Sequence, residues 1–167
     1  MRSPELWTAL ESAPIPYPFT LDAYLQEIQR IRGRPLHMHD LPVEATAVAC
    51  GLWIATRKAD HIFVAPGAKG VLRVNIVLHE VSHMLLDHGQ VGGIEEALSR
   101  LMKPTIETVE AIAARSRYET REERDAEQLA TLILMRANEP PPDQRDHGLR
   151  MIEQTFGYSA EDMLEHH

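Results

Sequence analysis

The sequence predicts an α+β domain in which a small three-stranded sheet lies beside a helical core. Two observations support this class. Three short runs with the branched or alternating residues typical of strands lie at residues 35–41, 46–56 and 61–65. Apolar residues recur at helical spacing around them, at residues 21–32, 71–88 and 120–136. We therefore expect one helix, then the sheet, then a core of two long helices packed on each other.

The N-terminal segment, residues 1–19, holds four of the eleven prolines and is expected to form an irregular arm. Thr20 can then cap a helix, because apolar residues follow it at helical spacing as far as Ile31. Gly33, followed by Pro35, ends this helix. The folded domain is therefore expected to begin at residue 20.

The three strand-like runs differ in pattern. "PLHMHDL" alternates, so His37 and His39 are expected to face one side of an edge strand as exposed polar positions. "TAVACGLWIAT" has the length and branched content of a buried strand, and "HIFVA" follows the charged turn "RKAD". "PGAKG" then breaks the chain before the helix at residues 71–88.

The second half of the chain is expected to be helical with interruptions. Residues 94–117 are polar to mixed, and a short helix at residues 146–156 follows the proline-rich linker "NEPPPDQ". We see no internal repeat and no second domain, so residues 20–163 are expected to form a single domain. Residues 164–167 look like the start of a vector-encoded polyhistidine tag, and His166 and His167 are excluded as candidate ligands.

The composition is that of a globular protein rather than a nucleic-acid or membrane protein. The formal net charge is −8, and 44% of the 167 residues are hydrophobic, with no run long enough to span a bilayer. Nonspecific nucleic-acid binding needs clustered basic residues. The densest basic cluster, at Arg30, Arg32 and Arg34, is typical of a solvated helix end. A single cysteine and the lack of a secretory pattern at the N-terminus favour a cytoplasmic location.

The stretch "NIVLHEVSHMLLDHG" carries the strongest functional pattern. His79 and His83 are four residues apart, so on a helix both imidazoles can reach one metal ion. Glu80 projects beside the metal, where it can accept a proton from a metal-bound water. This is the H-E-x-x-H arrangement of zinc metallopeptidases. The alternative interpretation is a hydrogen-bonded polar network inside a core helix, because buried histidines and glutamates are costly unless paired or metal-bound.

A catalytic zinc ion needs a third protein ligand. The helix at residues 120–136 offers Glu123 and Glu127, which share one face and are flanked by small alanines that permit close helix packing. A carboxylate from this helix would complete a His-His-Glu set. The alternative interpretation is a solvated charged face that includes Glu122, Glu123 and Glu127.

"HEVSHMLLDHG" followed by "EERDAEQLATLILM" resembles the ImmA/IrrE family of gluzincin-type metallopeptidases. Upstream, "RGRP" and "GLW" stand where the family has similar segments, so the resemblance covers roughly residues 20–136. It implies a zincin-like helical core, with zinc bound by His79, His83 and Glu123 and with Glu80 as the general base. Glu127 falls where an acidic residue holds the first histidine, or it replaces Glu123 as the ligand.

The resemblance also implies an activity and a partner. The protein would be a zinc endopeptidase that cleaves a helix-turn-helix repressor or antitoxin-like regulator, encoded separately, in response to stress. Candidate donors to the oxyanion are His88, Tyr118 and Tyr158, although His88 also suits a helix C-terminal cap and the tyrosines suit half-buried packing. Two other functions compete with this one. One is a zinc-containing binding partner or toxin component that sequesters a regulator without turnover. The other is a secreted peptidase, which the missing signal sequence disfavours.

Overall fold

The computed structural model describes residues 3–47, 49–88 and 120–140. Within these ranges it has an α+β fold, as expected. The elements in chain order are α1 (Pro4–Ser12), α2 (Leu21–Arg32), β1 (Leu36–Asp40), a 3-10 helix η1 (Val43–Ala47), β2 (Gly51–Ala55), β3 (Asp60–Val64), α3 (Gly70–Leu85) and α6 (Thr120–Ala137). Several predictions lie outside the described residues: the mixed segment 94–117, the helix 146–156, Tyr118, Tyr158 and the tag-like end at 164–167.

The three predicted strands form one small mixed sheet with the order β1-β3-β2. β1 pairs with β3 in parallel, and β2 pairs with β3 antiparallel, with Leu52 opposite Phe63. β2 is shorter than the predicted strand at residues 46–56. The first two residues of the predicted strand, Thr46 and Ala47, belong instead to η1. There Ala45 N–H donates to Pro42 O at 2.9 Å, and Thr46 Oγ1 donates to Val43 O at 2.6 Å. These local bonds compete with strand pairing.

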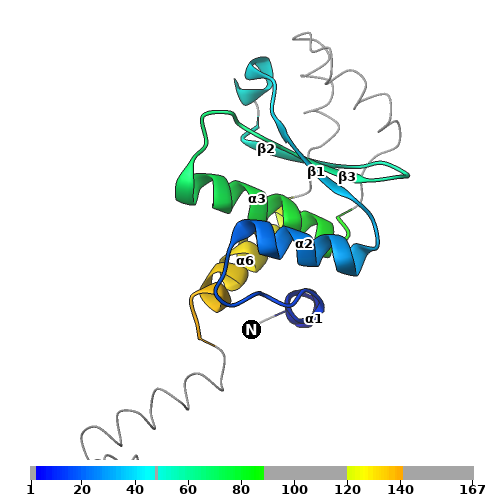
Figure 1. Cartoon of the computed structure of the whole chain (residues 1–167), viewed down its shortest axis with the longest axis vertical. Helices are drawn as coiled ribbons and strands as arrows, with labels where there is room; N and C mark the ends of the chain where they lie inside the picture. Colours follow the sequence, from blue (N-terminus) through cyan, green and yellow to red (C-terminus); the bar gives the residue numbers. More distant parts are fainter. Residues whose placement is uncertain (1–2, 48, 89–119, 141–167) are drawn as a thin grey trace, which may run out of the picture.

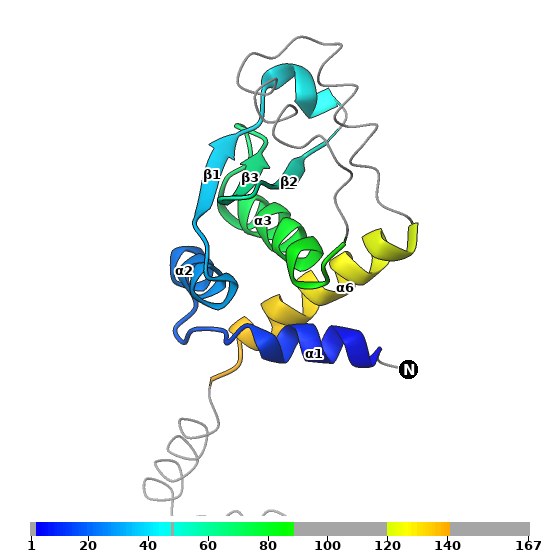
Figure 2. The same ribbon diagram turned by 90° about the vertical axis from the view of Figure 1, so that its right-hand side faces the viewer.

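The elements stack in layers, which Figures 1 and 2 show from two directions. Helix α3 packs against β2 and β3, α6 packs on α3, and α1 packs on α6. The core lies between these layers. Its fully buried members include Ile62 and Val64 of the sheet, Val77, Leu78 and Val81 of α3, and Leu129 and Ile133 of α6. The apolar face predicted for residues 71–88 is therefore confirmed as a core face.

Helix α1 corrects the prediction of an irregular arm at residues 1–19. Pro4 occupies the first turn of α1, where a proline costs nothing because its missing N–H has no partner within the helix. Leu6, Ala9 and Leu10 follow at helical spacing and are buried. The remaining prolines of this segment all come after the end of the helix. The sequence interpretation counted prolines without weighing their positions.

Asp60 anchors several elements to one another. It is 1% exposed, and its carboxylate accepts from Arg32 Nε at 2.6 Å and from the Trp53 indole N–H at 3.1 Å. Arg34 Nε lies 3.4 Å from the same carboxylate. A buried carboxylate is tolerated when it is paired in this way. The predicted solvated helix end is therefore wrong for Arg32 and Arg34, although Arg30 is exposed and pairs with Glu27 on the helix surface.

Within the described ranges, no helix combines the length and the apolar character needed to cross a membrane.

Candidate metal centre

Helices α3 and α6 bring His79, His83 and Glu123 together. His79 and His83 lie one turn apart on α3. His83 is fully buried with the apolar core face of the helix, whereas His79 is half-buried. Glu123 approaches from the first turn of α6, which packs across α3 (Figure 2). Each of the three residues offers one ligand atom, and these atoms all lie within 4.8 Å of one another.

The distances between these atoms suit a single metal ion. His79 Nε2 and His83 Nε2 are 3.1 Å apart, His79 Nε2 lies 3.4 Å from Glu123 Oε2, and His83 Nε2 lies 3.6 Å from Glu123 Oε1. Four ligands at zinc's usual bond lengths stand about 3.4 Å from one another. Two imidazoles and a carboxylate also match a common ligand set of catalytic zinc. The site can therefore hold a metal ion without rearrangement of the helices.

The end of α3 orients His83. Asp87 adopts a left-handed conformation with φ of 50°, and the turn is closed by Asp87 N–H to Met84 O at 3.4 Å and His88 N–H to His83 O at 3.0 Å. These two bonds form a Schellman motif. The turn brings the His88 ring under His83, with the two Nδ1 atoms 2.8 Å apart. This hydrogen bond leaves His83 Nε2 directed at the metal position.

His83 is held in its neutral, metal-binding form. Burial, and then the neighbouring His79 and His88, lower the pKa of His83 to about 3. Metal binding requires an unprotonated imidazole, so no proton has to leave His83 at neutral pH.

Glu80 lies beside the ligands in a tight space. It is 5% exposed. Burial, and then repulsion from Glu123, raise the pKa of Glu80 to about 8, while a backbone hydrogen bond at Trp53 opposes the rise. A Cβ atom on Gly51 would stand 2.7 Å from Glu80 Oε1 and 2.6 Å from Ile76 Cγ2. Strand β2 therefore approaches α3 so closely that a side chain at position 51 would displace the Glu80 carboxylate or Ile76.

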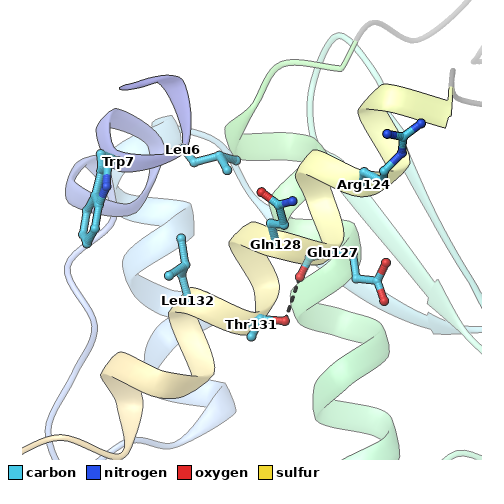
Figure 3. A pocket seen from close by; sticks show the side chains of 7 residues that line it. All are labelled: Leu6, Trp7, Arg124, Glu127, Gln128, Thr131 and Leu132. Atoms are coloured by element: carbon cyan, nitrogen blue, oxygen red, sulfur yellow. Dashed lines mark hydrogen bonds between the residues drawn. The ribbon is translucent and has the colours of Figure 1, made fainter. Parts of the chain in front are cut away.

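Glu127 does not take part in the centre, which answers the choice between the two glutamates. Its side chain is exposed and lines a cavity of about 420 Å³ between α1 and α6, together with Leu6 and Trp7 (Figure 3). Among the described residues, no hydrogen bond or ion pair joins its carboxylate to His79. The grouping of His79 and His83 with Glu123 therefore favours Glu123 as the ligand, as expected, over the alternative roles that the resemblance left open for Glu127. Four residues return to nearly the same face of a helix but advance about 6 Å along its axis, so Glu127 lies one turn beyond Glu123 on α6.

The structure places the three candidate oxyanion donors differently. His88 is buried and bonded to His83, so its ring is already engaged with a candidate ligand. Tyr118 and Tyr158 lie outside the described residues. Sequence reasoning missed Gly51 and Trp53, which contact Glu80 from β2. The "GLW" segment was noted only as part of the family resemblance, and its contact with Glu80 could not be read from it, because that contact joins segments about 30 residues apart.

Comparisons of this chain with protein-family models, with curated proteins and with solved structures gave no match.

Proposed function

We propose that the protein is a zinc-dependent endopeptidase. The observation that carries this proposal is the arrangement of His79, His83 and Glu123, whose ligand atoms lie within 4.8 Å of one another beside the buried carboxylate of Glu80. A purely structural zinc site needs four protein ligands and no neighbouring base, whereas a catalytic site has three and leaves one position for water. The ImmA/IrrE resemblance supports the same choice.

The roles of the residues follow from their chemistry. His79, His83 and Glu123 would hold the ion, and a zinc ion in such a site supplies an acidified water and polarises the scissile carbonyl. A cation held by the three ligands would lower the pKa of the neighbouring Glu80 and keep it ionised. Glu80 would then accept the proton of the attacking water at its carboxylate and pass it to the leaving amine. The backbone at Trp53 and the space left by Gly51 would keep the Glu80 carboxylate in one position during both transfers.

The proposed substrate class is a DNA-binding regulator with a helix-turn-helix fold, encoded as a separate protein. This part of the proposal rests on the family resemblance. The net charge of −8 favours the approach of a basic partner and disfavours direct binding to nucleic acid.

The test is to express the wild type and Glu80→Gln beside the candidate regulator. Glu80→Gln retains shape and removes the base, so we expect regulator cleavage to fall by at least about 10²–10⁴-fold while zinc content and regulator binding stay unchanged. Glu127→Gln is the matched control, because it neutralises an exposed glutamate outside the centre. If Glu80→Gln relieves repression as well as the wild type while the regulator stays intact, the protein sequesters its partner and is not a peptidase.

A further inference from the structure

Three histidines outside the candidate metal centre gather on the sheet. His37 and His39 alternate along β1, and His61 on β3 is the register partner of His37. Since side chains alternate across a strand, all three lie on the same face. Their neighbours Met38 and Ile62 point to the opposite face, where Ile62 joins the core with α3. His37 is exposed, and His39 and His61 are half-buried, so the expectation of exposed histidines on an edge strand is confirmed only for His37.

The spacing of the three rings suits a common metal ion. The ring centroid of His61 lies 5.3 Å from that of His37 and 5.2 Å from that of His39, and His37 and His39 are 6.4 Å apart. Three imidazoles on one tetrahedral zinc ion have centroids about 5.3 Å apart, from the zinc–nitrogen bond length and the size of the ring. Two of the three separations match this value, and the third exceeds it by about 1 Å. Among the described residues only His79, His83 and Glu123 already offer three ligand atoms within 4.8 Å of one another, so the exposed His37 side chain has to change its rotamer to join His39 and His61 on one ion.

Two ring nitrogens already stand at ligand spacing. His39 Nε2 and His61 Nδ1 are 3.0 Å apart, close to the 3.1 Å between the Nε2 atoms of His79 and His83. The His39 ring also stacks on Phe63 at 4.8 Å, which fixes its plane. Two paired strands therefore present two oriented nitrogens, which share a hydrogen bond, and a third histidine ring on the same face of the sheet.

The surroundings of His39 and His61 favour the unprotonated form that binds metal. Burial, followed by the proximity of His37, lowers the pKa of His39, and burial together with His39 and His37 lowers that of His61. Arg34 adds to the effect at His61, and Asp60 opposes it. An unprotonated imidazole can offer a lone pair to a metal ion, so these shifts favour metal binding by His39 and His61.

We propose that His37, His39 and His61 form a second metal site, for a divalent transition-metal ion that prefers imidazole ligands, such as Zn²⁺. Two histidines alternating on one strand and a third on the neighbouring strand make a three-histidine set of the kind that holds zinc with an open fourth position. The proposal does not depend on the peptidase function, because the site lies on the sheet face turned away from α3.

The experiment measures zinc bound per chain at defined free Zn²⁺, with the full chain carrying His166→Ala and His167→Ala so that the terminal histidines do not contribute. We expect two ions in this background and one ion in His37→Asn/His61→Asn. His37→Asn alone changes only an exposed side chain. It should lower the affinity for the second ion by more than about 100-fold, which exceeds the usual effect of removing a residue that only hydrogen-bonds to a ligand. Equal zinc content in the background and in His37→Asn would overturn the proposal.

Two further measurements separate this proposal from the first centre and from misfolding. In Glu123→Gln, which damages only the first centre, the ion at His37, His39 and His61 should remain. In the unsubstituted chain, the imidazole nitrogen resonances of these three histidines should shift as Zn²⁺ is added. Resonances that stay fixed while those of His79 and His83 shift would show a plain hydrogen-bonded cluster and contradict the second site.

Discussion

The contacts of Glu123 distinguish it from Glu127 on the same helix. Glu123 lies 3.4 Å from His79 and 3.6 Å from His83, whereas Glu127 is exposed beside the cavity between α1 and α6. Both carry the same charge and lie in the N-terminal half of α6, so general electrostatics affects them similarly. A difference between their variants therefore measures ligation itself.

We expect Glu123→Gln to lower zinc affinity by more than about 100-fold. Removing a residue that only hydrogen-bonds to a ligand lowers metal affinity by at most about 100-fold. Glu127→Gln should leave zinc affinity unchanged within the error of the measurement. A competition titration against a zinc chelator of known affinity measures both. Equal affinities for the two variants would show that Glu123 is not a ligand.

At the scale of single residues, the sequence predicted the site better than its surroundings. His79, Glu80 and His83 follow from a helical spacing of four, which is local, and the structure brings the two histidines together. Helical spacing alone left Glu123 and Glu127 open, the family resemblance implied Glu123, and the structure groups Glu123 with the two histidines. The contact of Gly51 with Glu80 could not be predicted, because it depends on how closely a strand and a helix approach after folding.

At the scale of elements, the turn that ends α3 links secondary structure to the candidate centre. Its backbone bonds carry the chain from His83 to His88, and the His88 ring supports His83. The turn depends on the positive φ of Asp87, and a glycine at position 87 would adopt this φ more easily. The side chain of His88 and the geometry of the turn can therefore be tested separately.

His88→Ala should weaken zinc binding by about 10–100-fold, because a ligand that loses its supporting hydrogen bond is less well oriented. Asp87→Gly keeps the turn and the His88 ring, so its zinc affinity should match the wild type. Isothermal titration of both metal-free variants provides the measurement. Loss of affinity in Asp87→Gly alone would mean that the turn, rather than the imidazole, supports His83.

Strand β2 bears on Glu80 through Gly51. In Gly51→Ala the new methyl group collides with Glu80 and Ile76, so we expect the Glu80 carboxylate to move. Because a displaced catalytic group slows the reaction, regulator cleavage should fall at least about tenfold. Zinc content should stay at the wild-type level, since the three ligands come from α3 and α6. Gly67→Ala is the control, because nothing lies within 4 Å of its Cβ position. Equal cleavage by the two variants would rule out this role for β2.

The elements themselves were predicted where the pattern was local. The strands, α2, α3 and α6 follow from alternation, caps and helical spacing, and all are present with ends shifted by a few residues. Helix α1 was missed because its prolines suggested an arm, although Pro4 suits a first turn and Leu6 and Leu10 need α6 to be buried. The parallel pairing of β1 with β3 was not predicted either, because register across a sheet depends on tertiary contacts.

At the scale of the whole molecule, the layers place the candidate centre between segments that are distant in sequence. His83 and Glu123 are 40 positions apart, since 123 − 83 = 40, and they meet only because α6 packs on α3. The unfolded chain can offer the two histidines to zinc, but it must close this long loop before Glu123 can join them. Closing a loop of that length costs about 4 kcal/mol in the chain-entropy model.

A zinc ion at this position would therefore act as a reversible cross-link, in the way a disulfide does in a protein with more than one cysteine. Its contribution to thermal stability rises with the free zinc concentration, to about 2.7 kcal/mol at 100 times the dissociation constant. We expect a chelator to lower the Tm of the wild type by several degrees and to leave Glu123→Gln nearly unchanged, as measured by calorimetry. A wild-type Tm that ignores the chelator would show that α3 and α6 hold together without the ion. Where the cross-link operates, zinc supply sets how long the folded protein survives as well as whether it can act.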